Sequence, residues 1–78
     1  MRILVFAHLK GVVGASEIDL PVGAVDFEGL WRALIAAHPG LERFRRSIRL
    51  AKNSEYVGAE ATFDDRDEVA LIPPVSGG

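Results

Sequence analysis

Apolar residues follow a helical period in the middle of the chain and short alternating runs on either side of it. From residue 27 the apolar positions are spaced by three and four, which places them on one face of a helix. They are Phe27, Leu30, Trp31, Leu34, Ile35 and His38. Asp26 is suited to cap the first turn, and Pro39-Gly40 supplies a stop signal. The pattern predicts one amphipathic helix over residues 26–38.

The flanking runs are rich in β-branched and large apolar residues, as is typical of strands. Residues 2–9, a turn over 10–14 and the alternating residues 17–20 predict an opening hairpin. After a segment 41–46 that turns Phe44 inward, residues 48–50, 56–57, 61–63 and 68–72 predict further strands. This order predicts an α+β fold, with a mixed four- to five-stranded sheet covered on one face by one main helix.

The length of 78 residues allows one hydrophobic core, so we expect a single domain over residues 1–74 and a flexible tail over 75–78. The chain has no cysteine, and its two histidines are far apart, so we expect no metal site. A net charge of -2 argues against nucleic-acid binding. No signal peptide or membrane-spanning run is evident, which predicts a cytoplasmic protein.

The charged clusters are interpreted as solvated surface. One is basic and one is acidic, and the acidic one lacks the glycine and the spacing of a calcium loop. The basic cluster comprises Arg43, Arg45, Arg46, Arg49 and Lys52, and the acidic one Asp64, Asp65, Asp67 and Glu68. His8 has no carboxylate or nucleophile near it in the sequence, so we expect a structural role and no catalytic residue in the body of the chain.

The first and last strands are apolar on both faces, which calls for cover on both sides of the sheet. One substantial helix can cover only one of them. We therefore predict a partner-binding surface on the face opposite the helix, centred on Phe6, Tyr56 and Ile72 and continuing along Pro74 to Gly78. Two alternatives are that segment 41–46 closes this face or that the chain forms a homodimer across it.

The C-terminus has the second informative pattern. Pro73-Pro74 is rigid and extended, and the following Val75-Ser76-Gly77-Gly78 has little side-chain bulk that could enter a core. We expect this tail to project from the domain. Two terminal glycines suit a segment that must be slim, although a frayed end is the simpler reading.

The stretch Asp67–Ala70 followed by Leu71–Gly78 resembles the C-terminus of molybdopterin synthase small subunits. The resemblance extends to the opening residues Val5–Lys10, the single helix and Asn53 before Tyr56, so it covers essentially the whole chain. It implies a ubiquitin-like β-grasp fold. The family commonly has glycine at the position of Arg66, so we expect a different turn there.

The resemblance also implies a function for the tail. A ubiquitin-activating-type adenylyltransferase would use ATP to adenylate the Gly78 carboxylate, and a sulfur donor enzyme would convert it to a thiocarboxylate. Val75, Ser76 and Gly77 would thread the terminus into the partner's active site. The carrier itself would bind no cofactor and have no catalytic group apart from its terminus.

Two small subunits would bind a dimer of the large subunit, where sulfur passes to cyclic pyranopterin monophosphate in molybdenum cofactor biosynthesis. The contact residues would be Phe6, Lys10, Tyr56, Ile72 and Pro74. Carriers for thiazole, cysteine or tRNA thiolation, a ubiquitin-like protein modifier and a binding module with an inert tail remain alternatives.

Overall fold

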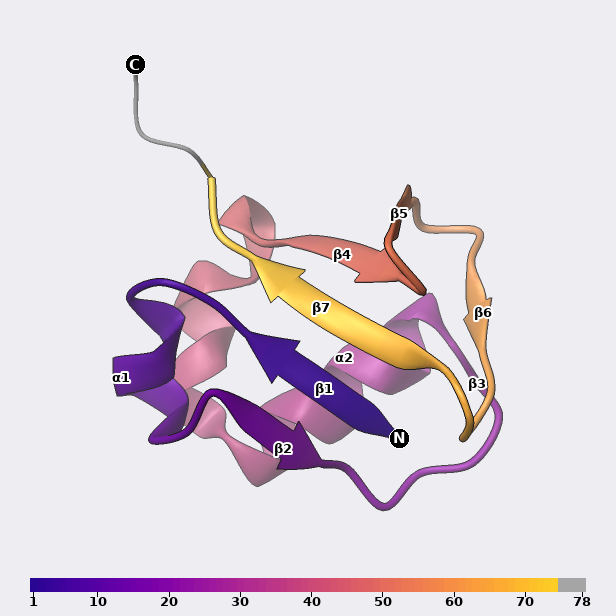
Figure 1. Cartoon of the computed structure of the whole chain (residues 1–78), viewed down its shortest axis with the longest axis horizontal. Coiled ribbons are helices and arrows are strands. Elements are labelled where there is room, and N and C mark those ends of the chain that lie inside the picture. The colour runs from indigo at the N-terminus through magenta and orange to yellow at the C-terminus, as the bar shows by residue number, and fades with distance from the viewer. Residues whose placement is uncertain (75–78) are drawn as a thin grey trace.

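The computed structural model describes residues 1–74, and the predicted tail over 75–78 lies outside the described residues. Five strands form the main sheet, in the order β2-β1-β7-β4-β5 (Figure 1). They are β1 (Arg2–Val5), β2 (Glu17–Asp19), β4 (Arg49–Lys52), β5 (Glu55–Val57) and β7 (Glu68–Ile72). β1 and β7 run parallel, and the other neighbours are antiparallel. The sheet is therefore mixed, as predicted.

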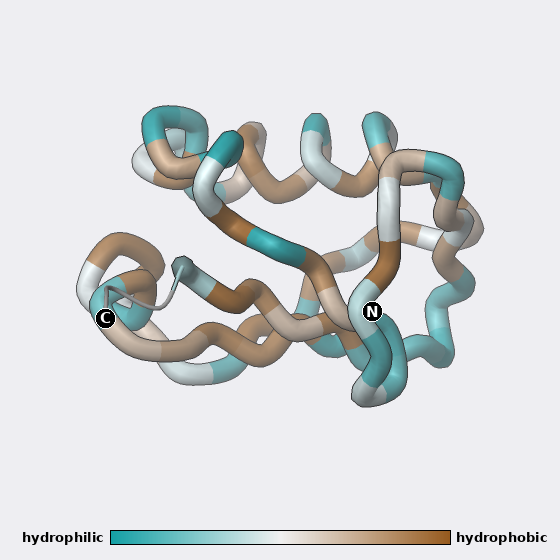
Figure 2. The backbone as a smooth tube through the Cα atoms, turned by 90° about the horizontal axis from the view of Figure 1, so that it is seen from above, coloured by the Kyte–Doolittle hydropathy of each residue, from teal (hydrophilic) through white to brown (hydrophobic). Residues whose placement is uncertain are grey.

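The helical layer consists mainly of α2 (Phe27–Ala37) and the 3-10 helix η1 (Pro39–Ser47). Both lie behind the sheet in Figure 1, and the edge-on view of Figure 2 shows these two helices as a layer apart from the strands. Asp26 caps α2 as predicted, because its Oδ1 accepts a hydrogen bond of 2.7 Å from the Gly29 N–H. One helix layer over a mixed sheet confirms the predicted fold class and agrees with the β-grasp arrangement that the resemblance implied.

The core lies between the two layers. Alternate residues of the central strands point toward the helices, because successive side chains of a strand face opposite sides. The buried side chains include Ile3, Val5, Val69 and Leu71 from the sheet and Leu30, Trp31, Leu34 and Leu41 from the helices. Segment 41–46 belongs to η1, which packs against α2 and sends Leu41 into the core. It does not close the opposite face of the sheet, so that alternative is wrong.

The connection after β1 differs from the predicted turn. The strand ends at Val5, and Ala7 takes a φ of 54° that redirects the chain into a short helix, α1 (Leu9–Val13). Leu9 is fully buried, and Gly14 ends the helix in the left-handed conformation with a φ of 88°. The helix propensities of residues 9–13 alone do not predict a helix here. The burial of Leu9 and the glycine cap at Gly14 therefore favour the helical conformation.

A second difference concerns residues 61–63, which were expected to extend the main sheet. Instead β6 (Thr62–Phe63) pairs with β3 (Val25–Asp26) in a separate two-stranded sheet. Phe63 is buried, so this small sheet closes one end of the core.

The acidic turn before β7 forms without a glycine. In the part of the chain that the structure describes, positive φ values of non-glycine residues occur at Ala7, Asn53 and Ser54, so Arg66 has an ordinary φ. The Asp67 Oδ2 accepts the Asp64 N–H at 2.8 Å, and the Asp64 Oδ1 accepts the Arg66 N–H at 3.0 Å. The hydrogen bond from Arg66 is the main cause that holds the pKa of Asp64 below its usual value. Carboxylates therefore shape this turn at the position where the resemblance led us to expect glycine.

Within residues 1–74, no helix combines the length and the apolar character needed to cross a bilayer.

Candidate functional site

The face of the main sheet opposite α2 carries an apolar surface that no described element covers. We call it the outer face; its apolar residues are Leu4, Phe6, Ala51, Tyr56, Ala70 and Ile72. Figure 1 looks onto this face, with the helices behind the strands. Phe6 is 44% exposed and Tyr56 is 56% exposed, and they are the large hydrophobic residues that stand out as exposed among residues 1–74. An exposed apolar cluster of this kind is typical of a binding surface.

Strand register explains why the outer face is hollowed. Leu4 pairs with Ala70, Ala70 pairs with Ala51, and Ala51 pairs with Tyr56, so one row crosses four strands. The two alanines in its middle form a low floor between larger side chains. The resulting groove of about 310 Å³ is lined by Phe6, Tyr56 and Ile72 together with Ser54 and Glu68. It can receive an apolar side chain from another molecule.

A second hollow of about 370 Å³ lies where the tail leaves the sheet. Phe6, Ala7, Ile72, Pro73 and Pro74 line it, and β7 ends at Ile72. The positive φ of Ala7 turns the chain away directly after Phe6 and leaves that ring exposed beside the prolines. The apolar surface therefore continues from the outer face to the last described residues before the tail.

The two ends of the outer face differ in charge. At one end Arg2 is paired with two carboxylates, because its Nε lies 3.0 Å from Glu17 Oε2 and its Nη1 lies 3.1 Å from Glu68 Oε2. The hydrogen bond with Glu17 is the main cause that raises the pKa of Arg2. At the other end, beside Ile72, the Arg49 guanidinium carbon lies 4.1 Å from the Tyr56 ring centroid. This is the geometry of a cation–π contact.

Asn53 fixes the position of the hairpin that carries Tyr56. Its Oδ1 accepts the Glu68 N–H at 3.0 Å, and its Nδ2 donates to Asp67 Oδ1 at 3.0 Å. Its own N–H donates to the Glu68 carbonyl at 2.8 Å. These bonds tie the β4–β5 turn to the start of β7, so both walls of the groove belong to one rigid unit. In the sequence analysis, Asn53 was named only as part of the family resemblance, with no role in the site.

The structure brings four of the predicted contact residues together and leaves one apart. Phe6 and Ile72 line both hollows, while Tyr56 lines the first and Pro74 the second. Lys10 lies exposed on α1 and lines neither hollow. The predicted reactive segment Val75, Ser76, Gly77 and Gly78 lies outside the described residues. Sequence reasoning missed Arg49 as part of this site, because it was grouped with the basic cluster.

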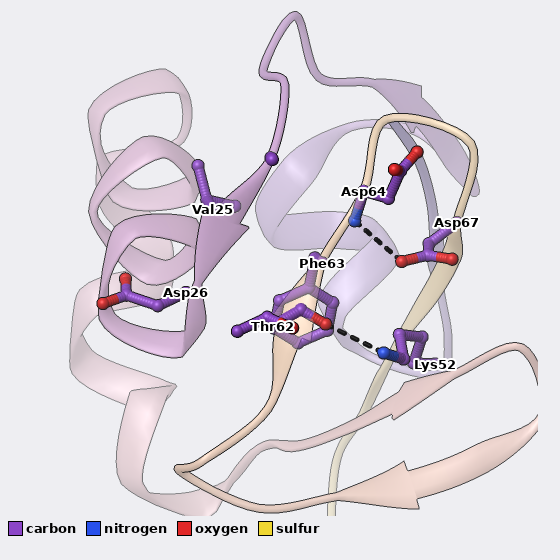
Figure 3. A pocket seen from close by; sticks show the side chains of 8 residues that line it. Val25, Asp26, Lys52, Thr62, Phe63, Asp64 and Asp67 are labelled. Carbon is purple, nitrogen blue, oxygen red and sulfur yellow. Dashed lines mark hydrogen bonds between the residues drawn. The ribbon is translucent and has the colours of Figure 1, made fainter.

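A different groove, of about 630 Å³, lies between the small sheet and the acidic turn (Figure 3). Its polar groups bond within the protein: Lys52 Nζ donates to the Thr62 carbonyl at 2.8 Å, and Asp67 accepts from the backbone of the turn. Among residues 1–74, no three His, Cys, Asp or Glu side chains are placed to hold a metal ion. The groove is the junction between the two sheets, and its hydrogen bonds support a structural role.

Comparison with known proteins decides the family of this chain. The model of the ThiS family matches residues 3–78. The chain belongs to the ThiS family. The match includes the outer-face residues of β1, β5 and β7 and extends through the terminal Gly77-Gly78.

Individual relatives agree with this assignment. The chain is 38% identical to the molybdopterin synthase sulfur carrier subunit of Chlamydomonas reinhardtii, covering 100% of this chain and 98% of that protein. The crystal structure of SAMP1 from Haloferax volcanii is similar with a TM-score of 0.84 and 32% identity, covering 100% of this chain and 98% of the other. A complex of subunits 1 and 2 of the molybdopterin-converting factor from Helicobacter pylori contains a chain of the same fold. That match has a TM-score of 0.68 and 22% identity, covering 99% of this chain and 96% of the other.

Proposed function

We propose that this ThiS-family chain is the sulfur carrier subunit of a molybdopterin synthase and works through its C-terminal Gly78. The observation that supports this most strongly is the full-length similarity to a molybdopterin synthase sulfur carrier subunit, at 38% identity. The sequence also carries the pair Gly77-Gly78, whose lack of side chains suits the slim, reactive segment that this function needs. The absence of cysteine in the sequence means that a persulfide on the carrier is not available as the sulfur form.

The proposed chemistry takes place at the terminal carboxylate. An α-carboxyl has a pKa of about 3.5, so the group is ionised at neutral pH and can attack the α-phosphorus of ATP held by an adenylyltransferase. A carboxyl oxygen–phosphorus bond forms and pyrophosphate leaves. Hydrosulfide supplied by a donor enzyme then displaces AMP at the carbonyl carbon: the carbon–sulfur bond forms, the bond to AMP breaks, and a thiocarboxylate remains. The thiocarboxylate sulfur then attacks an acceptor carbon and an oxygen substituent of that carbon leaves, as water or phosphate. Water cleaves the resulting thioester, which leaves sulfur on the acceptor and restores the carboxylate.

The outer face is the proposed docking surface for the large subunit. Phe6, Tyr56 and Ile72 are apolar and partly exposed in the free chain, and the surface leads to the prolines before the tail. A partner bound there would cover this surface while receiving residues 75–78 in its active site. The complex of the two converting-factor subunits from Helicobacter pylori supports a partner of this class for a chain of this fold.

A second candidate function is protein modification. The similarity to SAMP1 of Haloferax volcanii favours it, because SAMP1 of Methanosarcina acetivorans, which has the same fold, is described as a small archaeal modifier protein. Both functions begin with adenylation of the terminal glycine. They differ in the final acceptor, which is a pterin in one case and a lysine side chain in the other.

Sulfur transfer in a reconstituted system tests the proposal. The carrier, its adenylyltransferase, ATP, a sulfur source and the cognate large subunit are expected to convert cyclic pyranopterin monophosphate to molybdopterin. Deletion of Gly78 should abolish product formation, as should one extra residue after it. A protease-removable extension is the matched control, since trimming back to Gly78 should restore activity. Product from the untrimmed chain would contradict the proposal, and isopeptide adducts on lysines without pterin product would favour the modifier function.

A further inference from the structure

Arg49 occupies a distinctive position at the edge of the outer face. It pairs with Ile72 across β4 and β7, and its guanidinium stacks on Tyr56 at 4.1 Å. Both of these neighbours line the groove. Arg49 is exposed and lies at the end of the sheet where β7 leads into Pro73 and Pro74.

The charge of Arg49 is not balanced by a carboxylate of the described chain. Ion pairs within residues 1–74 involve Arg2, Arg45 and the N-terminal amine, and none involves Arg49. At the opposite end of the outer face, Arg2 is held between Glu17 and Glu68. Within residues 1–74, the outer face therefore presents one positive charge that no described carboxylate pairs with, next to the apolar groove and beside Ile72, where β7 ends.

We propose that Arg49 is a specificity residue of the docking surface and binds a carboxylate of the large subunit at the rim of its apolar contact. This inference rests on the proposed function and adds the chemistry of the partner. The partner would insert an apolar side chain into the groove above Ala51 and Ala70, and it would place an Asp or Glu beside that side chain. We infer an acidic partner from charge complementarity, because an arginine at the rim of an interface favours a negatively charged surface on the other protein.

Stacking on Tyr56 suits Arg49 to this task. The planar guanidinium can lie on an aromatic face and still direct its N–H groups outward from its edge, where they match the two oxygens of a carboxylate. Because the ring already restricts the side chain, less conformational entropy is lost when the partner binds. A lysine at this position would keep the charge but lose the paired donors.

A second copy of the chain fits this surface less well. In a two-fold dimer the same patch faces itself, so the outer faces would bring two Arg49 side chains to one interface. Of the carboxylates on this face, Glu17 and Glu68 already bind Arg2, and Asp19 lies 3.5 Å from the N-terminal amine. Like charges facing each other disfavour such a dimer, whereas an acidic partner relieves the imbalance.

Binding to the purified cognate large subunit, measured at several salt concentrations, tests the inference on the full-length chain. Arg49→Gln should weaken binding about three- to tenfold at low salt and reduce the dependence of the affinity on salt. Arg49→Lys should recover only part of this loss. Arg32→Gln is the matched control, since Arg32 is an exposed arginine of α2 on the other layer, and it should leave binding unchanged. Melting curves of all variants exclude a folding defect as the cause.

The outcomes separate this inference from the proposed function. If Phe6→Ala weakens binding while Arg49→Gln behaves like Arg32→Gln, the docking surface stands and the role of Arg49 is overturned. Self-association of the wild-type chain that Arg49→Gln abolishes would identify a second copy as the occupant and would also overturn it. If an Arg49→Gln effect vanishes in a chain whose C-terminus is amidated at Gly78, Arg49 binds its own terminal carboxylate, which contradicts the inference. A wild-type chain that does not bind the large subunit overturns both proposals.

Discussion

The two faces of the main sheet use similar residues for different ends. Leu71 and Ile72 are neighbours on β7, yet Leu71 is fully buried under the helices while Ile72 is partly exposed on the outer face. The same contrast holds at the end of β1, where Val5 is buried and the next residue, Phe6, is 44% exposed. The inner face is completed by α2 and η1, whereas no described element covers the outer face. The comparison supports the proposal that the apolar residues of the outer face serve binding more than folding.

The two faces also differ in packing. On the inner face, large side chains from sheet and helices interdigitate around Trp31, and the core residues there are nearly inaccessible. On the outer face, Ala51 and Ala70 leave a groove between larger neighbours. A filled inner face stabilises the monomer, while a hollowed outer face suits an inserted side chain from a partner.

The difference between the two faces is tested most strongly by replacing Leu71 and Ile72, the two neighbours on β7, with alanine. Leu71→Ala should lower the free energy of unfolding by about 2–5 kcal/mol, because it opens a cavity in the core. Ile72→Ala should lower it by about 1 kcal/mol or less, yet should weaken large-subunit binding about tenfold or more. Urea unfolding and binding titrations of both variants measure this pair of effects. Equal losses of stability in the two variants would show that the outer face belongs to the core.

A second test removes the support of the outer face without touching its apolar residues. Asn53→Ala should destabilise the fold by about 1–3 kcal/mol, since it loses two side-chain hydrogen bonds and places alanine at a φ of 50°. Asn53→Gly separates the two causes, because glycine tolerates this φ and still lacks the side chain. Urea unfolding should rank the wild type above Asn53→Gly and Asn53→Gly above Asn53→Ala. Equal stability of all three would remove Asn53 as an anchor.

A smaller effect of opposite sign is expected at the next position. Asn53 and Ser54 form a two-residue connection between β4 and β5, and both have positive φ, as in the type I′ turn of β-hairpins. Glycine fits the second central position better than serine, whose φ is 74°. Ser54→Gly should therefore stabilise the chain by up to about 1 kcal/mol. Thermal melting should show a higher midpoint; a lower one would mean that the Ser54 side chain contributes more than the strain costs.

The smallest expected effect concerns pH and the helix layer. The hydrogen bond from Arg45 is the main cause that lowers the pKa of Glu28 below its ordinary value. Because the folded-state pKa is the lower one, the stabilisation is present above the unfolded value of about 4.3 and is lost as the pH falls through the folded pKa. Glu28→Gln should therefore melt slightly below the wild type at neutral pH and together with it in acid. A deficit that persists in acid would assign the effect to something other than this ion pair.

Much of the fold is predictable because its longest elements carry strong periodic signals. The helix over 26–38 has a cap, an apolar stripe and a stop signal, and the structure places α2 at Phe27–Ala37. α1 escaped prediction because it has only five residues and includes Gly11, Val12 and Val13, which are poor helix formers. The pairing of β3 with β6 involves two residues on each strand, too few for a sequence pattern to reveal.

The candidate site was predictable where it depends on strand alternation. Apolar residues on both faces of the first and last strands pointed to Phe6 and Ile72, and the structure places them on one surface. Arg49 was not recognisable, because its role depends on register with Ile72 and on the stack with Tyr56 across the hairpin. The groove likewise depends on two alanines that only meet when β4 pairs with β7.

The most direct test of the account is the position of sulfur on the activated carrier. After incubation with the adenylyltransferase, ATP and a sulfur source, intact-mass and fragment spectra should show one terminal oxygen replaced by sulfur, at Gly78. The body of the chain, which contains no cysteine, should carry none. Sulfur located at any other residue, or a chain that is activated without gaining sulfur, would contradict the claim that this protein carries sulfur on its C-terminal carboxylate.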